Sequence, residues 1–421
     1  MKPFLVCLVV ILFCSCQKNP ATEAPADTPN QQEKNAGMLY FRSESGLYAY
    51  DLDKDTIAWK APAFLLDNNA MIYEDGFIYT GSVYGVTAIN AKTGQVKWST
   101  GFERGLSHAQ SSFSPFNQPV VTDSLVYMIG YYNSSENAGL FCINKETGAV
   151  TWERDLSQGL DSKAWVYSTP VVMGDKIIAL NHGNYDLNHI HCLNRFTGEV
   201  LWRNDDMASD LLWDNPIALN QTTVLFGSRS STLYTLNVAD GRISGLMSTS
   251  PERLVVNMKL LLQDKTIYAG TEGGIKSINP ENGAVLKFYA DTINNYLITP
   301  ASIYVHKQYG VIQSRSLKDY AVKWSWSSPI QHAIDSAAAV RFLYTHAYTS
   351  FLVSDDETVY CYQFMPGEGS QPLINGFYLL NAQTGALIKE IKLPKLGYAV
   401  GRNLLVVKNG KGYRSMSIYV Q

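Results

Sequence analysis

Several groups on which cofactor, nucleic-acid and hydrolytic chemistry depend are scarce or missing in this chain of 421 residues. Only six cysteines occur, three of them within the first 16 residues, and none forms an adjacent pair or a Cys-x-x-Cys motif. The net charge is −3, so there is no electrostatic case for nucleic-acid binding. The sequence contains no Gly-x-Ser-x-Gly nucleophile motif and no long amphipathic helical pattern. These absences point to an all-β protein without recognisable catalytic machinery.

What the chain does contain is a recurrent spacing: an Asx residue, a glycine four positions later and a tryptophan after four more. The clearest copies span residues 90–98, 144–152 and 194–202. The Asx side chain starts a turn by accepting backbone hydrogen bonds, the glycine takes the positive-φ position, and the tryptophan packs between neighbouring sheets. The glycines of these copies are Gly94, Gly148 and Gly198, and the tryptophans of the repeat are Trp59, Trp98, Trp152, Trp202 and Trp324.

Weaker copies extend the series to eight. The Asx position, or its substitute, falls at residues 51, 90, 144, 194, 237, 279, 316 and 381. The shorter intervals are about 40 residues, enough for four short strands. Radial repetition of four-stranded antiparallel sheets is a β-propeller, so we predict an all-β propeller of eight blades, with seven as the alternative. Spare strands at 38–41, 404–408 and 413–419 predict that one blade combines the early and late parts of the chain.

The N-terminus has the features of an export signal. Lys2 precedes an apolar stretch too short to span a bilayer, and Ser15 stands directly before Cys16. This ending resembles a bacterial lipobox, which implies cleavage before Cys16 and lipid such as palmitate on that residue. We therefore predict a signal peptide at 1–15, a lipidated cysteine with a flexible tether at 16–37, and the propeller at 38–421. The lack of acidic residues directly after Cys16 favours an outer-membrane anchor that faces the periplasm.

The repeat unit resembles the PQQ-like repeat of quinoprotein dehydrogenases and their non-enzymatic relatives, over about residues 38–421. The dehydrogenases hold their quinone with calcium, an acidic base and often a disulfide between adjacent cysteines, and this chain has neither such a pair nor a convincing calcium cluster. Lipid anchor, length and repeat type resemble the BamB family of lipoproteins, whose loops dock onto a membrane partner. The resemblance implies a non-enzymatic scaffold without a cofactor. A glycan- or small-ligand-binding propeller and a PQQ-dependent dehydrogenase are the alternatives.

The extra length of the chain gathers on one face of the predicted propeller. We name the strands of a blade a to d in chain order. The d-to-a and b-to-c connections lie on one face, here named the loop face, and the short a-to-b and c-to-d turns lie on the opposite face, here named the plain face. The surplus falls at 99–117, 131–138, 153–168, 182–188, 325–349 and 364–375, all on the loop face. Long loops on a rigid scaffold usually carry binding. The candidate residues for an envelope protein partner or a small ligand are His108, Tyr131, Tyr132, Trp165, Tyr167, His182, Tyr185, Trp213, His346 and Phe364.

Metal and disulfide sites have little support. His189 and His191 fall on one face of a predicted strand, with His182 in the loop before it, and three imidazoles could bind zinc or copper. Such histidine pairs are common on strands without metal, so the sequence predicts no metal site. Cys142 and Cys192 occupy the same position in successive blades, too far apart for a disulfide, and are predicted to be buried free thiols.

Overall fold

The computed structural model describes residues 37–43, 46–62, 71–82, 85–102, 118–131, 138–157, 164–165, 168–183, 188–207, 216–227, 232–248, 260–271, 273–307, 311–328, 348–354, 357–366, 372–392 and 404–414. The chain divides into two compact units, Met1–Asn35 and Ala36–Gln421. The first unit, with the predicted signal peptide and Cys16, lies outside the described residues. Within the described residues there is no helix long and apolar enough to cross a membrane.

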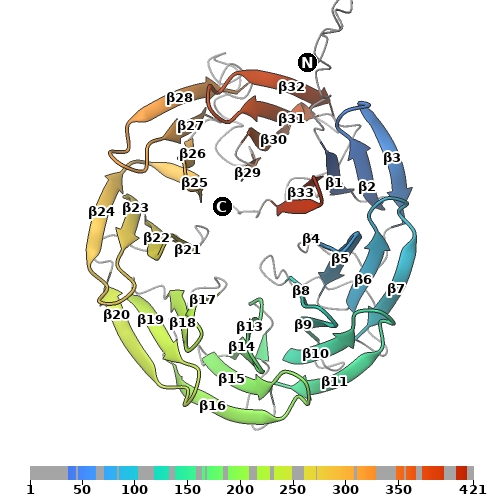
Figure 1. Cartoon of the computed structure of the whole chain (residues 1–421), viewed down its shortest axis with the longest axis vertical. Helices are drawn as coiled ribbons and strands as arrows, with labels where there is room; N and C mark the ends of the chain where they lie inside the picture. The colour runs from blue at the N-terminus through green and yellow to red at the C-terminus, as the bar shows by residue number, and fades with distance from the viewer. Residues whose placement is uncertain are drawn as a thin grey trace, which may run out of the picture. The chain divides into compact units, whose positions relative to one another are not determined.

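Eight antiparallel sheets follow one another around a ring, which makes the fold an eight-bladed β-propeller (Figure 1). Blade 2 holds β4 (Met71–Glu74), β5 (Phe77–Ser82), β6 (Gly85–Asn90) and β7 (Val96–Gly101); blade 3 holds β8 (Val120–Val121), β9 (Leu125–Tyr131), β10 (Ala138–Asn144) and β11 (Val150–Asp155); blade 4 holds β12 (Ala164–Trp165), β13 (Val171–Met173), β14 (Lys176–Gly183), β15 (Asn188–Asn194) and β16 (Val200–Met207); blade 5 holds β17 (Ile217–Asn220), β18 (Thr223–Gly227), β19 (Thr232–Asn237) and β20 (Ile243–Ser248). The predicted blade count is confirmed.

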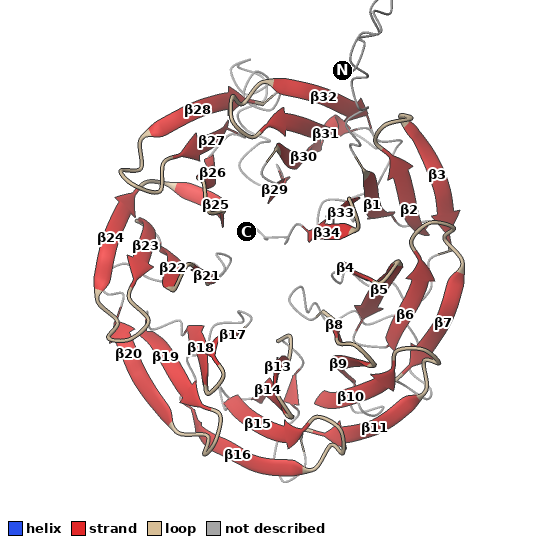
Figure 2. Ribbon diagram, in the orientation of Figure 1, coloured by secondary structure: helices blue, strands red, loops and turns tan. Residues whose placement is uncertain are grey.

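The remaining blades repeat the same order of strands. Blade 6 holds β21 (Leu261–Gln263), β22 (Thr266–Thr271), β23 (Gly274–Ile278) and β24 (Val285–Ala290); blade 7 holds β25 (Ile293–Ile298), β26 (Ile303–Lys307), β27 (Val311–Arg315) and β28 (Val322–Ser327); blade 8 holds β29 (Tyr348–Ser354), β30 (Thr358–Pro366), β31 (Pro372–Asn381) and β32 (Leu387–Lys392). Strand a lies nearest the centre of the ring and strand d forms its rim (Figure 2).

Blade 1 closes the ring. It joins β1 (Met38–Ser43), β2 (Gly46–Asp51) and β3 (Thr56–Ala61) to β33 (Leu404–Lys408) and β34 (Lys411–Arg414) in one sheet. The junction is the antiparallel pair β1–β33, which runs from Met38 opposite Val407 to Phe41 opposite Leu404. The prediction that early and late strands share a blade is therefore confirmed. The last strand begins at Lys411 rather than at 413, and residues 415–419 lie outside the described residues.

All eight predicted Asx turns are present on the plain face. In each, the backbone N–H four positions after the Asx residue, or its substitute, donates to the carbonyl of that residue at 2.8–2.9 Å. Asn90 shows the full pattern, because its Oδ1 also accepts from the N–H groups of Lys92 and Thr93 at 3.0 Å. Six turns place glycine at the positive-φ position, whereas Asp55 (φ 58°) and Tyr320 (φ 61°) occupy it in blades 1 and 7.

The glycine has a second role, at the contact between one blade's rim strand and the next blade's Asx turn, here named a joint. Trp98 of blade 2 donates its indole N–H to the carbonyl of Lys145 in blade 3 at 2.9 Å. Its ring covers Gly148, where an added Cβ would lie 2.7 Å from the indole. Only glycine, which has no Cβ, leaves room for the indole to pack on the turn. The glycine of one blade therefore allows the tryptophan of the preceding blade to dock, and this contact couples the two blades. The other tryptophan joints bind the equivalent carbonyls in the same way: Trp59 to Ala91, Trp152 to Arg195, Trp202 to Val238 and Trp324 to Ala382.

Three joints lack the tryptophan and are built differently. Between blades 6 and 7, the Tyr289 hydroxyl donates to the carbonyl of Leu317 at 2.8 Å, and its ring packs against Tyr320. Between blades 8 and 1, Lys389 donates to the carbonyl of Leu52 and pairs with Asp55, both at 2.9 Å. Tyr320 and Asp55 thus replace the turn glycine in the two joints where no indole packs against the turn. Between blades 5 and 6, the corresponding rim positions are Gly245 and Met247, neither of which has a side-chain hydrogen-bond donor.

The loop face differs from the prediction in one respect. Part of its surplus is built as longer strands rather than as loops: β14 and β16 have eight residues, β30 nine and β31 ten. The proposed loops at 182–188 and 364–375 are therefore partly wrong, because residues 182–183, 364–366 and 372–375 extend the hairpins of blades 4 and 8. An additional short strand, β12, pairs with the extended end of β14. The elaboration still lies on the loop face.

Candidate functional site

Four of the binding-face candidates fall in described strands. Tyr131 ends β9, and Phe364 pairs with Tyr348 in the extended hairpin of blade 8. Trp165 lies in β12, opposite His182 of β14. The structure thus brings Trp165 and His182 together at the backbone level, on the loop-face end of blade 4. The other candidates, His108, Tyr132, Tyr167, Tyr185, Trp213 and His346, lie outside the described residues.

Ion pairs between blades link the turns of the plain face. Lys145 is buried and pairs with the exposed carboxylate of Asp75 at 2.7 Å. Lys97 pairs with Glu146 at 2.6 Å across the same blade junction. Glu357 of blade 8 pairs with Lys408 of blade 1 at 3.2 Å. These ion pairs connect the short turns of neighbouring blades, so we interpret the plain face as structural.

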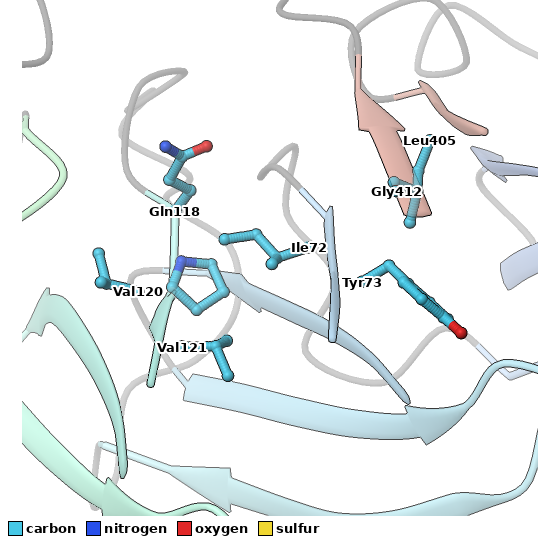
Figure 3. A pocket seen from close by; sticks show the side chains of 8 residues that line it. Ile72, Tyr73, Gln118, Val120, Val121, Leu405 and Gly412 are labelled. Carbon is cyan, nitrogen blue, oxygen red and sulfur yellow. The ribbon is translucent and has the colours of Figure 1, made fainter. Parts of the chain in front are cut away.

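A cavity of about 340 Å³ lies among the innermost strands of blades 1, 2 and 3 (Figure 3). Its lining runs from the loop-face beginnings of the inner strands, at Gln118 and Leu405, to residues near the plain-face turns, at Val121 and Gly412. Most of its lining residues are apolar, but polar atoms make up more than half of the exposed lining. The volume falls within the range of small-molecule sites. The lining residues are Ile72, Tyr73, Gln118, Pro119, Val120, Val121, Leu405 and Gly412.

Sequence reasoning did not find this cavity. Gly412 is the position that shapes it, because an added Cβ would lie 2.9 Å from the Cβ of Tyr73. No local pattern distinguishes Ile72 or Val120 from the other apolar residues of inner strands. The cavity exists because ring closure brings β34 beside β4, so only knowledge of the closing register could have revealed it.

A polar cluster lies within blade 4. The Nδ1 atom of His189 is 2.8 Å from Oδ1 of Asp205 on the adjacent strand β16. Arg203 binds both carboxylate oxygens of Asp205 at 2.6 Å. Arg203 first, and His189 after it, lower the pKa of Asp205 to about 2. His191 is 4% exposed, and burial, with a smaller effect from Arg203, lowers its pKa to about 4.

The register separates the three histidines considered for metal. His189 stands opposite Asn181 and His191 opposite Ala179, whereas His182 stands opposite Asn188. Position 182 is therefore in the opposite phase of the alternation from 189 and 191. Within the described part of the chain, no three His, Cys, Asp or Glu residues converge to hold a metal ion.

The described cysteines are buried free thiols, as predicted for Cys142 and Cys192. Burial raises the pKa of Cys142 to about 12 and that of Cys192 to about 11. Cys361 is also buried, and its pKa is raised for the same reason. Thiols of this kind are poor nucleophiles and poor metal ligands, since both roles need the thiolate.

Comparison with known proteins gives one family. The family model of the outer membrane protein assembly factor BamB matches residues 22–139, 85–325 and 185–368. The BamB of Moranella endobia (strain PCIT) is 21% identical over 283 residues, which cover 57% of this chain and 69% of that relative. At this identity the relative assigns no residue-level role, and family membership rests on the family model.

Solved structures agree on the fold. The crystal structure of BamB from Moraxella catarrhalis superposes with a TM-score of 0.54 at 13% identity, covering 84% of this chain and 98% of that one. The quinohemoprotein alcohol dehydrogenase of Comamonas testosteroni superposes with a TM-score of 0.55 at 14% identity, covering 83% and 70%. The propeller is thus shared by a BamB protein and by an alcohol dehydrogenase, so the fold alone does not assign a function. By the extent of the family match, the chain belongs to the family of the outer membrane protein assembly factor BamB and is a PQQ-like β-propeller.

Proposed function

We propose that this protein is a non-enzymatic binding or scaffold module of the bacterial envelope, anchored by lipid on Cys16 to the outer membrane and facing the periplasm. The observation that carries the proposal is the difference between the two faces. Ion pairs and Asx turns fix the plain face, whereas the loop face has the extended hairpins of blades 4 and 8. A rigid ring with one elaborated face suits the docking of a partner protein. The related factor's name, an outer membrane protein assembly factor, makes an assembly component of that membrane the favoured partner.

The partner test compares the two faces directly. Protein captured from native envelopes would be compared for the wild type, the loop-face variant Trp165→Ala/Trp213→Ala and the plain-face variant Phe196→Ala. Phe196 is a suitable control because it is 50% exposed in the Asx turn of blade 4. We expect the loop-face variant to lose the co-captured partner, with an unchanged thermal midpoint, and the control to retain it. Equal capture by all three proteins would refute docking through these residues.

The anchor requires its own experiment, because Cys16 lies outside the described residues. Metabolic labelling with a palmitate analogue should label the wild type and not Cys16→Ala. The variant should also leave the membrane fraction. Labelling that persists in Cys16→Ala would contradict lipidation at this residue.

A second candidate function is capture of a small ligand, and the cavity favours it. Its lining combines aliphatic residues with a larger share of exposed polar atoms, so a small ligand of mixed polarity would suit it. An Ile72→Trp variant would fill the space from blade 2, because the half-buried Ile72 side chain points toward β8 (Figure 3) and lies away from the blade 4 hairpin. If partner capture survives this change while binding of a small ligand is lost, the cavity and the docking surface are separate sites.

The enzyme alternative is tested by adding pyrroloquinoline quinone with Ca²⁺ and following substrate-dependent dye reduction. We expect no activity and no quinone absorbance retained after gel filtration. Dye reduction that depends on the quinone would overturn the non-enzymatic proposal.

A further inference from the structure

The inference concerns the two buried histidines of β15 and is independent of the proposed function. His189 and His191 are 3% and 4% exposed and occupy successive same-face positions of a regular ladder with β14. Ala179, the cross-strand neighbour of His191, packs with Ile129 and Leu140 of blade 3. The histidine pair therefore faces the junction between blades 3 and 4. It lies near the loop-face end, because β15 begins there.

Asp205 fixes the orientation and the tautomer of His189. The Asp205 carboxylate accepts from Arg203 through both oxygens, so it also acts as an acceptor toward His189. The Nδ1 atom of His189 therefore carries the hydrogen toward Asp205, which leaves Nε2 as the nitrogen that can bind a ligand. Arg203 in turn fixes Asp205 through both oxygens.

Each ring keeps one buried nitrogen without a partner. These are Nε2 of His189 and Nδ1 of His191, which make no hydrogen bond in the described structure. Buried polar atoms are normally satisfied, so two unsatisfied nitrogens on successive same-face residues mark a place where a ligand could bind. A histidine that donates Nδ1–H to a carboxylate while its Nε2 is free has the arrangement by which proteins orient metal-binding imidazoles.

We propose that His189 and His191 bind a transition-metal ion of the Zn²⁺ class, with His189 ligating through Nε2 and Asp205 supporting it from behind. Neutral imidazole is a preferred ligand of such ions. Two protein nitrogens leave two positions of a tetrahedral ion open. Because Arg203 already balances the charge of Asp205, the open positions favour water-derived hydroxide or a carboxylate from a bound molecule. The site would therefore recognise an anionic group at the junction of blades 3 and 4.

The experiment measures Zn²⁺ binding to the mature protein, made without a histidine tag, by calorimetry and by native mass spectrometry. Co²⁺ is used in parallel, because its visible absorption reports nitrogen ligation in a tetrahedral site. The variants are His189→Gln, His191→Gln and Asp205→Asn. The matched control is His306→Gln, since His306 is equally buried with an unpartnered Nε2 but stands alone on β26.

We expect one Zn²⁺ per chain in the wild type, with affinity about 10- to 100-fold weaker in Asp205→Asn. Either histidine substitution should weaken it further, and His306→Gln should leave it unchanged. Absence of wild-type binding, or equal losses in His306→Gln, would overturn the proposal, as would wild-type affinity in either His189→Gln or His191→Gln. If a histidine variant does not fold, the wild-type Co²⁺ spectrum decides, because an octahedral, oxygen-ligated spectrum contradicts a two-histidine site.

Discussion

Replacing Trp98 by alanine should test whether the joints stabilise the ring. The indole is 7% exposed, packs against Tyr79 at a centroid distance of 6.0 Å and covers Gly148. Truncating a buried aromatic side chain costs about 3–5 kcal/mol of unfolding free energy, most of it from lost packing and the remaining cavity. The carbonyl of Lys145 also loses its indole donor, which is worth about 1 kcal/mol within that total. We therefore expect Trp98→Ala to destabilise the protein by about 3–5 kcal/mol.

Urea unfolding followed by far-ultraviolet circular dichroism would measure the effect, with two further variants for comparison. Trp98→Phe keeps most of the packing and removes the hydrogen bond, so it should lose less. Ile57→Ala removes a side chain that is 40% exposed on the rim and should change stability by about 0.5 kcal/mol or less. A loss below about 1 kcal/mol for Trp98→Ala, similar to that for Ile57→Ala, would refute the idea that the tryptophans hold the blades together.

Three further predictions follow from the described contacts. Hydrogen exchange should be faster in β20, at the joint of Gly245 and Met247, than in β7, whose Trp98 docks on the next blade; equal protection would contradict unequal joints. The free energy of unfolding should fall as the pH drops from about 6.5 toward 4, because His191 binds a proton in the unfolded state in this range, whereas burial lowers its pKa in the folded state to about 4. His191→Gln should flatten this part of the stability profile when it is measured in EDTA. Cys142, Cys192 and Cys361 should resist a thiol reagent in the native protein and react on unfolding, because burial raises their pKa values; rapid native labelling would show the blades to be open.

The scaffold could be predicted because its chemistry is local. An Asx oxygen, a glycine four residues later and an alternating strand specify one turn, and the turn repeats often enough to count blades. The partners of the joints are not local. Tyr289 and Lys389 take the place of tryptophan at their joints, and only the three-dimensional structure shows this, because both residues donate to carbonyl groups of the next blade.

The candidate site was predicted less well. The loop-face residues share no motif, and only Tyr131, Trp165, His182 and Phe364 fall in described strands. Pairing of His189 with Asp205 depends on the register of β15 and β16, which has an irregularity between Asn188 and Ile190. Strand periodicity cannot place such an irregularity, so the carboxylate partner could not be foreseen.

The pairing of β1 with β33 has a consequence for the order of assembly. Almost the whole chain separates these two strands, so the contact that completes the ring is also the one with the largest loop to close. During synthesis, β1 to β3 are made first and then remain with an open edge until residues 404–408 arrive. Blades 2 to 8 can form before blade 1 is complete. Until then, the unpaired edge of β1 is the part of an incompletely folded molecule that is most exposed to pairing with another chain. Ring closure thus depends on a full-length chain: a truncated product that ends before β33 keeps the edge of β1 unpaired.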